Sequence, residues 1–244
     1  MEKKLQTFKN ILNSSRYTVA LCGSGLLKEC GYSGMRSLDI AYDIENRYGD
    51  SPEYIYSSAY YNTRPEKFFK FFKSEVLDVK IEPSETFFAL AELEKQEKLQ
   101  TTISKNCFSL SERAGCKNVY NIYGTIYENI CSHCGKEYPI EFMKQASSIP
   151  LCTECGHIVR PKVKLFGEML DHDIITKVAD EVAKADVLLL LGTTLESYTY
   201  KNYIKYFRGS SIIVIHQNPH FSDARTNLVF LDQPKNVLPK LLEE

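Results

Sequence analysis

The sequence lacks the features that mark several specialised classes of protein. No apolar run reaches 18 residues and no apolar leader follows Met1, which argues against a membrane-spanning helix and a secretory signal. No internal repeat or low-complexity tract occurs. The formal net charge is only −1 and no basic stripe stands out, so neither nucleic acid nor a membrane surface is an expected partner. The cytoplasm is the expected location.

The composition is that of an ordinary globular protein. Of the 244 residues, 43% are hydrophobic and 25% are charged. This length predicts one large domain, or one domain that carries a smaller insertion, with a core that needs no disulfide bonds. Because cytoplasmic thiols are normally reduced, the eight cysteines are better interpreted as metal ligands or buried apolar side chains than as disulfides.

Short apolar runs indicate a sheet that is buried on both faces. Helical patterns separate several of these runs, and strands that alternate with helices predict βαβ units. We therefore expect an α/β fold with a Rossmann-like parallel sheet. The expected strands are Tyr17–Leu21, Thr101–Ile103, Val119–Tyr123, Val187–Leu191 and Ile212–Ile215, and the expected helices are 2–15, Leu38–Tyr48, Pro65–Phe72, Phe87–Leu99, Asp173–Ala185, Ser197–Phe207 and Asn236–Leu242.

Four cysteines form two C-x-x-C pairs with 17 residues between them: Cys131 with Cys134, and Cys152 with Cys155. Zinc prefers four tetrahedral ligands, and two thiolates on one tight turn can face the same ion. The spacing is typical of a zinc site, in preference to four unliganded cysteines. Since four thiolates leave no open position, we expect a structural ion. His133 and His157 are alternative ligands, although surface positions on the turns suit them better.

A glycine-containing turn, Gly23-Ser24-Gly25, directly follows the first expected strand. A strand that ends in such a turn is typical of a nucleotide phosphate site in an α/β sheet. The full G-x-G-x-x-G motif is absent, because Lys28 occupies the place of the third glycine. Taken alone, the turn fits a nucleotide site and an ordinary strand-to-helix connection equally well.

Further motifs follow in a fixed order along most of the chain: Gly23–Leu26, Gly31 and Arg36, Asn62–Phe68, Leu110 with Glu112–Gly115, Arg160–Val163, Phe166–Glu168, Gly192–Leu195 and Asn236–Leu238. In this order they resemble the motifs of the sirtuins, the family of NAD-dependent protein deacylases. The paired cysteines also lie where that family has its zinc.

The resemblance implies a Rossmann-like NAD-binding domain of residues 1–36, 76–128 and 162–244, and a smaller helical and zinc-ribbon domain of residues 37–75 and 129–161. NAD or ADP-ribose would lie between them, and an acyl-lysine or other protein substrate would border Phe166–Glu168. By position, the nucleotide contacts would come from Gly23, Ser24, Gly25, Arg36, Lys105, Asn106, Gly192, Thr193, Thr194 and His216.

The chain departs from the family pattern at its catalytic base, because Tyr123 stands where the family has a histidine followed by glycine. That histidine acts as general base on the ribose, and imidazole suits the task with a pKa near 6.5. A phenol, with a pKa near 10, is almost fully protonated at neutral pH. Tyr123 and the retained Asn106 are the candidate catalytic residues, with Tyr123 a doubtful base.

Three further departures surround the expected nicotinamide and ribose positions. Phe108 replaces the carboxylate that would bind the nicotinamide amide, and an unpaired buried amide costs about 1–3 kcal/mol. Met35 replaces an aromatic residue that would shield the cleaved sugar from water. His216 replaces an asparagine on the adenosine side, where a ribose contact or a surface position is expected of it.

These departures predict a sirtuin-like protein that binds NAD or ADP-ribose and zinc, with deacylase chemistry weak or lost. In two alternative hypotheses the protein is an active enzyme. One is ADP-ribosyl transfer or NAD hydrolysis, since cleavage of the glycosidic bond does not need the base. The other is protein-lysine deacylation with Tyr123 or a water as base.

Overall fold

A six-stranded parallel sheet forms the larger part of the molecule. The structure is a computed structural model that describes residues 1–35 and 37–243. The strand order is β3-β2-β1-β7-β8-β9, and every neighbouring pair is parallel. This confirms the predicted Rossmann-like α/β fold. The strands are β1 (Thr18–Cys22), β2 (Thr101–Ser104), β3 (Val119–Asn121), β7 (Val187–Leu191), β8 (Ser211–His216) and β9 (Leu228–Leu231).

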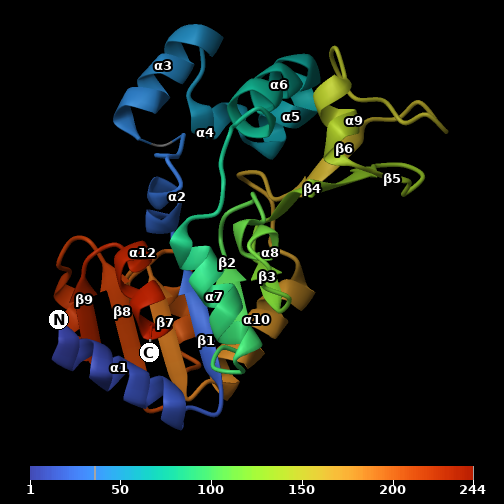
Figure 1. Ribbon diagram of the computed structural model, residues 1–244. Helices are drawn as coiled ribbons and strands as arrows, with labels where there is room; N and C mark the ends of the chain where they lie inside the picture. Colours follow the sequence, from blue (N-terminus) through green and yellow to red (C-terminus); the bar gives the residue numbers. More distant parts are fainter. Residues whose placement is uncertain (36, 244) are drawn as a thin grey trace.

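Helices cover both faces of this sheet, and the alternation of side chains along its strands builds a core on each side. All five residues of β1 and of β7 are buried. Leu189 and Leu191 face one core, with α1 (Glu2–Ser14), α7 (Glu85–Lys95) and α12 (Pro234–Val237). Leu188 and Leu190 face the other, with α10 (His172–Lys184) and α11 (Lys201–Ile204) (Figure 1).

Short helices form much of the upper part of the molecule in Figure 1. They are α2 (Gly25–Glu29), α3 (Leu38–Tyr48), α4 (Pro52–Ile55), α5 (Ser58–Thr63) and α6 (Pro65–Phe72), which continues into a π-helical turn (Lys73–Leu77). Their core is aromatic. Phe68 and Phe72 are fully buried and stack with ring centroids 5.5 Å apart.

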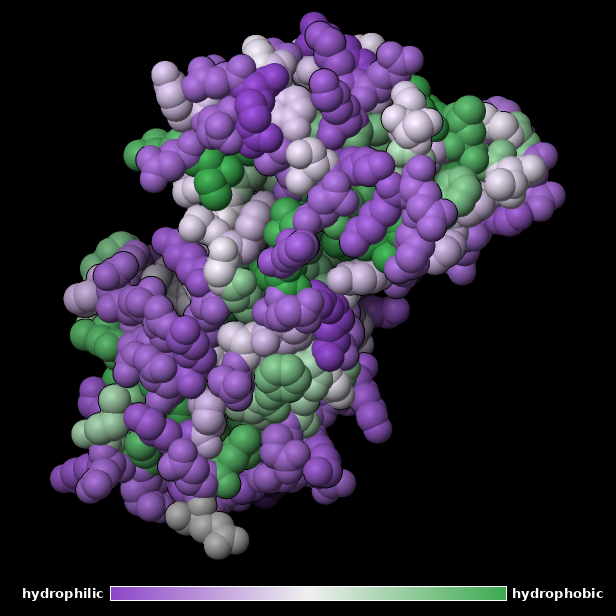
Figure 2. All heavy atoms as spheres, turned by 45° about the horizontal axis from the view of Figure 1, so that its top comes forward, coloured by the Kyte–Doolittle hydropathy of each residue, from purple (hydrophilic) through white to green (hydrophobic). Residues whose placement is uncertain are grey.

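A small antiparallel sheet carries the paired cysteines. Its strand order is β5-β4-β6, with β4 (Gly124–Cys131), β5 (Glu137–Tyr138) and β6 (Val159–Val163). Helix α9 (Ile140–Gln145) follows β5, and α8 (Leu110–Arg113) lies between β2 and β3 in the chain. Figure 2 shows a largely hydrophilic surface, with apolar and neutral residues gathered at the waist between the large sheet and the upper part.

Several element boundaries differ from the prediction. The helix expected over Ser197–Phe207 is limited to α11, because Tyr200 turns into the core and its hydroxyl lies 2.6 Å from the carbonyl oxygen of Cys22. Helix α7 ends at Lys95 rather than Leu99, since Glu97 adopts a left-handed conformation with φ of 59°. Strand β9 was not predicted. No helix in the described part of the chain is long and apolar enough to cross a membrane.

Candidate functional site

The carboxyl ends of β1 and β7 meet in a junction built from glycines. The chain passes from β1 to β2 and β3 on one side and later returns to β7 on the other side of β1, so the strand order reverses at these ends, where α/β folds commonly bind ligands. The Gly23 N–H donates to the carbonyl oxygen of Leu191 at 2.8 Å, and the Gly25 N–H donates to that of Gly192 at 3.0 Å. The predicted phosphate loop is therefore tied to the turn that follows β7.

This junction has no room for side chains. A Cβ on Gly23 would lie 2.3 Å from the Gly192 oxygen, and a Cβ on Gly25 would lie 2.8 Å from the Gly192 Cα. Gly192 itself has a φ of 59°, a conformation that disfavours other residues. The three glycines allow two backbones to touch, which is why this turn needs glycine although it lacks the full dinucleotide motif.

The predicted site residues follow the ends of five neighbouring strands. Because the carboxyl ends of parallel strands lie at one edge of the sheet, all of these positions lie along that edge. Ser24 is exposed, Thr193 and His216 are buried, and Thr194 is half-buried. Arg36 lies outside the described residues. The loops are Gly23–Gly25 after β1, Lys105 and Asn106 after β2, Tyr123 after β3, Gly192–Thr194 after β7 and His216 at the end of β8.

Asn106 is buried, and both polar atoms of its side chain make a hydrogen bond close by in the chain. Its Nδ2 donates to Ser104 Oγ at 2.7 Å, and its Oδ1 accepts the backbone N–H of Phe108 at 2.9 Å. Lys105 is half-buried in the same loop. The amide thus fixes the turn that places Phe108.

Phe108 is only 4% exposed and packs edge-to-face on Tyr32, with ring centroids 5.4 Å apart. Burial raises the pKa of the Tyr32 phenol to about 12, with a further contribution from the nearby Cys107 thiol. The two rings therefore form a neutral aromatic pair. No carboxylate stands at position 108 to accept a hydrogen bond from an amide.

Tyr123 links the loop after β3 to the segment after β7 through a hydrogen bond. Its hydroxyl lies 3.1 Å from Thr199 Oγ1, in the segment between β7 and α11. Its ring packs against the apolar core under the sheet, and its carbonyl oxygen accepts the Lys164 N–H at 2.9 Å. Thr199 was not among the predicted site residues, because it is 76 residues away from Tyr123 and no motif marks it.

The four paired cysteines form one cluster, as predicted. Their sulfur atoms all lie within 4.8 Å of one another; the Cys131 and Cys155 sulfurs are 3.4 Å apart, and the Cys134 and Cys152 sulfurs are 3.5 Å apart. Zinc–sulfur bonds of about 2.3 Å in a tetrahedron place sulfurs roughly 3.8 Å apart, so the set fits zinc. The members are Cys131, Cys134, Cys152 and Cys155.

The surroundings of Cys152 favour its thiolate. Burial opposes ionisation of Cys152, but the Tyr138 hydroxyl donates to its sulfur at 3.1 Å and the Glu154 N–H at 3.4 Å, so its pKa falls to about 6. His133 and His157 are exposed and stack on each other with centroids 4.1 Å apart. They lie on the surface of the turns, the position that the sequence favoured for them.

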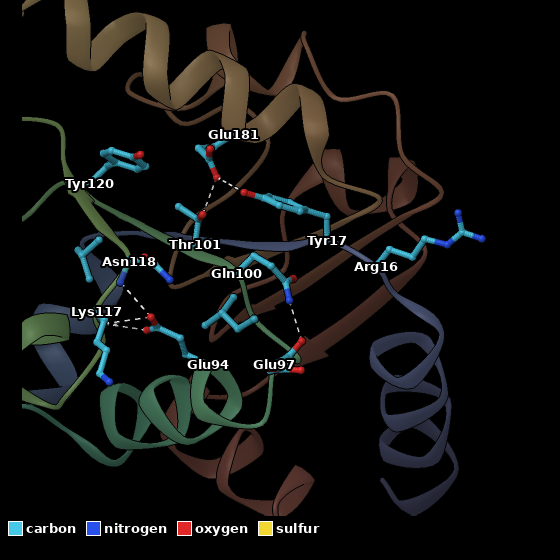
Figure 3. Close-up of a pocket in the computed structure, with 12 residues that line it drawn as sticks. Arg16, Tyr17, Glu94, Glu97, Gln100, Thr101, Lys117, Asn118, Tyr120 and Glu181 are labelled. Atoms are coloured by element: carbon cyan, nitrogen blue, oxygen red, sulfur yellow. Dashed lines mark hydrogen bonds between the residues drawn. The ribbon is translucent and has the colours of Figure 1, made fainter.

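Two cavities lie away from the glycine junction. One of about 730 Å³ opens where β1, β2 and β3 begin, and buried Glu181 there accepts hydrogen bonds from Tyr17 and Thr101 (Figure 3). Its described lining contains none of the predicted site residues. The other, of about 910 Å³, is bordered by β3, β4, β6 and the segment with Glu168 and Met169.

Known proteins of one family resemble this chain. A family model described as the Sir2 family matches residues 23–199. An NAD-dependent protein deacetylase of Clostridium perfringens (strain 13 / Type A) is 32% identical over 244 residues, 100% of each chain. A structure solved to explain sirtuin substrate affinity has a TM-score of 0.89 at 24% identity, over 98% of each chain. A Sir2 mutant with histidine changed to tyrosine, solved with p53 peptide and NAD, has a TM-score of 0.82 at 25% identity, over 98% of each chain.

Proposed function

The chain belongs to the Sir2 family, and from this premise we propose that it binds NAD or ADP-ribose, with deacylase activity that is weak or absent. The nucleotide would cross the glycine junction of β1 and β7. It would lie between the domain of residues 1–36, 76–128 and 162–244 and the smaller one of residues 37–75 and 129–161. The deacetylase name of the 32% identical relative supports the choice of ligand.

The observation that carries the loss of activity is the environment of Tyr123. A general base must be unprotonated near the working pH, and a phenol has an ordinary pKa near 10. The Tyr123 hydroxyl is hydrogen-bonded to the neutral hydroxyl of Thr199, and its ring packs against an apolar core. In this proposal Tyr123 closes the end of the cleft and does not take a proton from the ribose.

Phe108 and Asn106 support binding of ADP-ribose at least as well as binding of NAD. A nicotinamide amide beside Phe108 would meet a buried aromatic pair instead of a hydrogen-bond acceptor. The Asn106 side chain is committed to Ser104 and to the backbone of Phe108. The ADP-ribose part of the ligand needs neither group.

A protein ligand would bind beside the Phe166–Glu168 segment. Phe166 donates its N–H to the Tyr56 carbonyl at 3.0 Å, and its own carbonyl accepts the Ser58 N–H at 2.9 Å. Glu168 is fixed by Arg160 at 2.6 Å. The solved histidine-to-tyrosine Sir2 mutant holds a peptide and NAD together, so in that protein the exchange is compatible with both ligands. An acyl-lysine peptide is the ligand class we propose here.

Calorimetry and a deacetylation assay test the proposal. We expect measurable binding of ADP-ribose and NAD, and turnover of an acetyl-lysine peptide far below the 1–1000 s⁻¹, roughly, of typical enzymes. The double variant Tyr123→His with Phe108→Asp should gain activity if the chain is a lapsed enzyme. Turnover by the natural chain at ordinary enzyme rates would refute the proposal.

A second candidate is an enzyme that cleaves NAD without deacylation, by ADP-ribosyl transfer or hydrolysis. It is favoured by the retention of Asn106 at the carboxyl edge of β2, next to the glycine junction. Labelled NAD distinguishes this candidate from the first. It predicts release of free nicotinamide or labelling of protein, and an incubation that yields neither product excludes it.

A further inference from the structure

Helix α2 continues directly from the glycine junction and ends on a half-buried carboxylate. The helix begins at Gly25, has only five residues and finishes at Glu29. A helix this short is not stable by itself. Leu26, which is 1% exposed, fixes its first turn to the apolar core. The place of the other end of α2 depends on what Glu29 contacts.

The Glu29 carboxylate accepts hydrogen bonds from two other helices. Its Oε2 accepts the Thr86 hydroxyl at 2.6 Å and the Ser84 hydroxyl at 3.1 Å, at the start of α7. Its Oε1 accepts the backbone N–H of Lys235 at 3.2 Å, at the start of α12. In Figure 1, α2 rises from the sheet beside the first turn of α7. One side chain therefore connects the helix after the proposed phosphate loop to two helices that cover the sheet.

The three donors suit this carboxylate. Ser84 is the N-cap residue of α7, where a serine hydroxyl normally accepts a hydrogen bond from its own helix. It makes no such bond, and its hydroxyl donates to Glu29 instead. Thr86 is fully buried. Lys235 is the second residue of α12, so its N–H has no acceptor within that helix. The start of α7 also carries partial positive charge, which favours a carboxylate there.

Glu29 contributes position more than stability. Burial raises its pKa above the ordinary value, although the hydrogen bonds from Thr86, Lys235 and Ser84 oppose the shift. A carboxyl group whose pKa is raised in the folded state destabilises the fold when it ionises. Glu181, near the beginning of the same strands, is the opposite case, because its hydrogen bonds outweigh burial and lower its pKa. The hydrogen bonds of Glu29 thus determine chiefly where α2 lies.

We propose that Glu29 is a positioning residue for the loop that receives the nucleotide diphosphate; this inference rests on the proposed nucleotide binding. Leu26 holds one end of α2 and Glu29 holds the other, so the loop Gly23–Gly25 is ordered before the ligand arrives. An ordered loop loses less conformational entropy on binding. Without the anchor, the competent arrangement of α2 is one among several, and the affinity falls in proportion to its population.

Calorimetry with ADP-ribose, together with thermal unfolding, tests the inference. We expect Glu29→Ala to lower the affinity by about 10- to 100-fold, which corresponds to a competent population of about 1–10%. Glu29→Gln should keep the affinity within a few-fold, because an amide can accept the Lys235 N–H and donate to the two hydroxyls. Glu181→Ala is the matched control, since Glu181 is also a carboxylate with three hydrogen-bond donors. It should lower Tm more than Glu29→Ala does and leave the affinity unchanged.

The single substitution Thr86→Val keeps the inference testable if Glu29→Ala does not fold. It removes one donor and should lower the affinity by about 3- to 10-fold, the usual contribution of one hydrogen bond. Combined with Glu29→Ala it should add no further loss, because both changes break the same contact. Unchanged affinity in Thr86→Val, or a loss in Glu181→Ala as large as in Glu29→Ala, overturns the inference and leaves the proposed function intact. Failure of the natural chain to bind either ADP-ribose or NAD removes both.

Discussion

Replacement of Gly23 by alanine is the sharpest test of the junction between β1 and β7. The new Cβ would lie 2.3 Å from the Gly192 oxygen and 2.4 Å from the Thr193 Cβ, well inside van der Waals contact. The two backbones must separate, which also weakens the hydrogen bond from Gly23 N–H to the Leu191 carbonyl. Such overpacking costs about 1–3 kcal/mol. For a chain of this size, each kcal/mol lowers Tm by about 2–4 °C.

Thermal unfolding and ADP-ribose calorimetry measure the two consequences separately. We expect Gly23→Ala to lower Tm by about 2–12 °C and the ADP-ribose affinity by at least about tenfold, since the displaced loop is the proposed phosphate site. Gly49→Ala is the control. Gly49 has a φ of 80° but open space around its Cβ position, so the control should lose stability and keep nucleotide affinity. A Gly23→Ala protein with unchanged affinity would refute the assignment of the junction as the phosphate site.

Three other perturbations have defined outcomes. Removal of zinc by a chelator, or the substitution Cys134→Ser, should lower Tm and unfold the small sheet, because metal binding contributes to the folding energy of such segments. Metal content and circular dichroism measure this effect. An unchanged melting curve would contradict it. The pKa of Glu181 is lowered from its ordinary value, since hydrogen bonds from Thr101, Tyr17 and Lys184 outweigh the opposing effect of burial. The ionised Glu181 carboxylate therefore stabilises the fold above about pH 4.5, which is the pKa of the group in the unfolded chain. That stability is lost as the pH falls through the lower folded value, so Glu181→Gln should flatten the acid limb of the stability curve. Nicotinamide should not bind measurably to the natural chain, whereas Phe108→Asp should introduce nicotinamide binding that calorimetry can detect.

The parallel sheet could be predicted because its strands are short apolar runs. Val187–Leu191 has five consecutive aliphatic residues, and only a strand covered on both faces buries all of them. The paired cysteines could be interpreted as readily, since two such pairs in a reduced chain are typical of a metal site. In both cases the signal lies in neighbouring residues.

The long-range contacts of the predicted site residues could not be predicted in this way. Thr199 reaches Tyr123 only because loops after β3 and β7 share one edge of the sheet. Asp223 lies in a short 3-10 helix with no motif, and it meets His216 through the turn that follows β8. The Tyr200 side chain ends the expected helix for a tertiary reason, since its hydroxyl is used between β1 and β2.

Strand β4 begins immediately after Tyr123 and ends on Cys131, the first of the paired cysteines. Its pairing with β6 shifts in register between Thr125 and Asn129, where residues 126–128 have no partner on β6. Strand β6 runs beside it in the opposite direction, and Lys164, just past its end, donates to the Tyr123 carbonyl. One pair of antiparallel strands therefore joins the metal-bearing turns directly to the loop that holds Tyr123. An ion that performs no chemistry can in this way contribute to how firmly the Tyr123 loop is held.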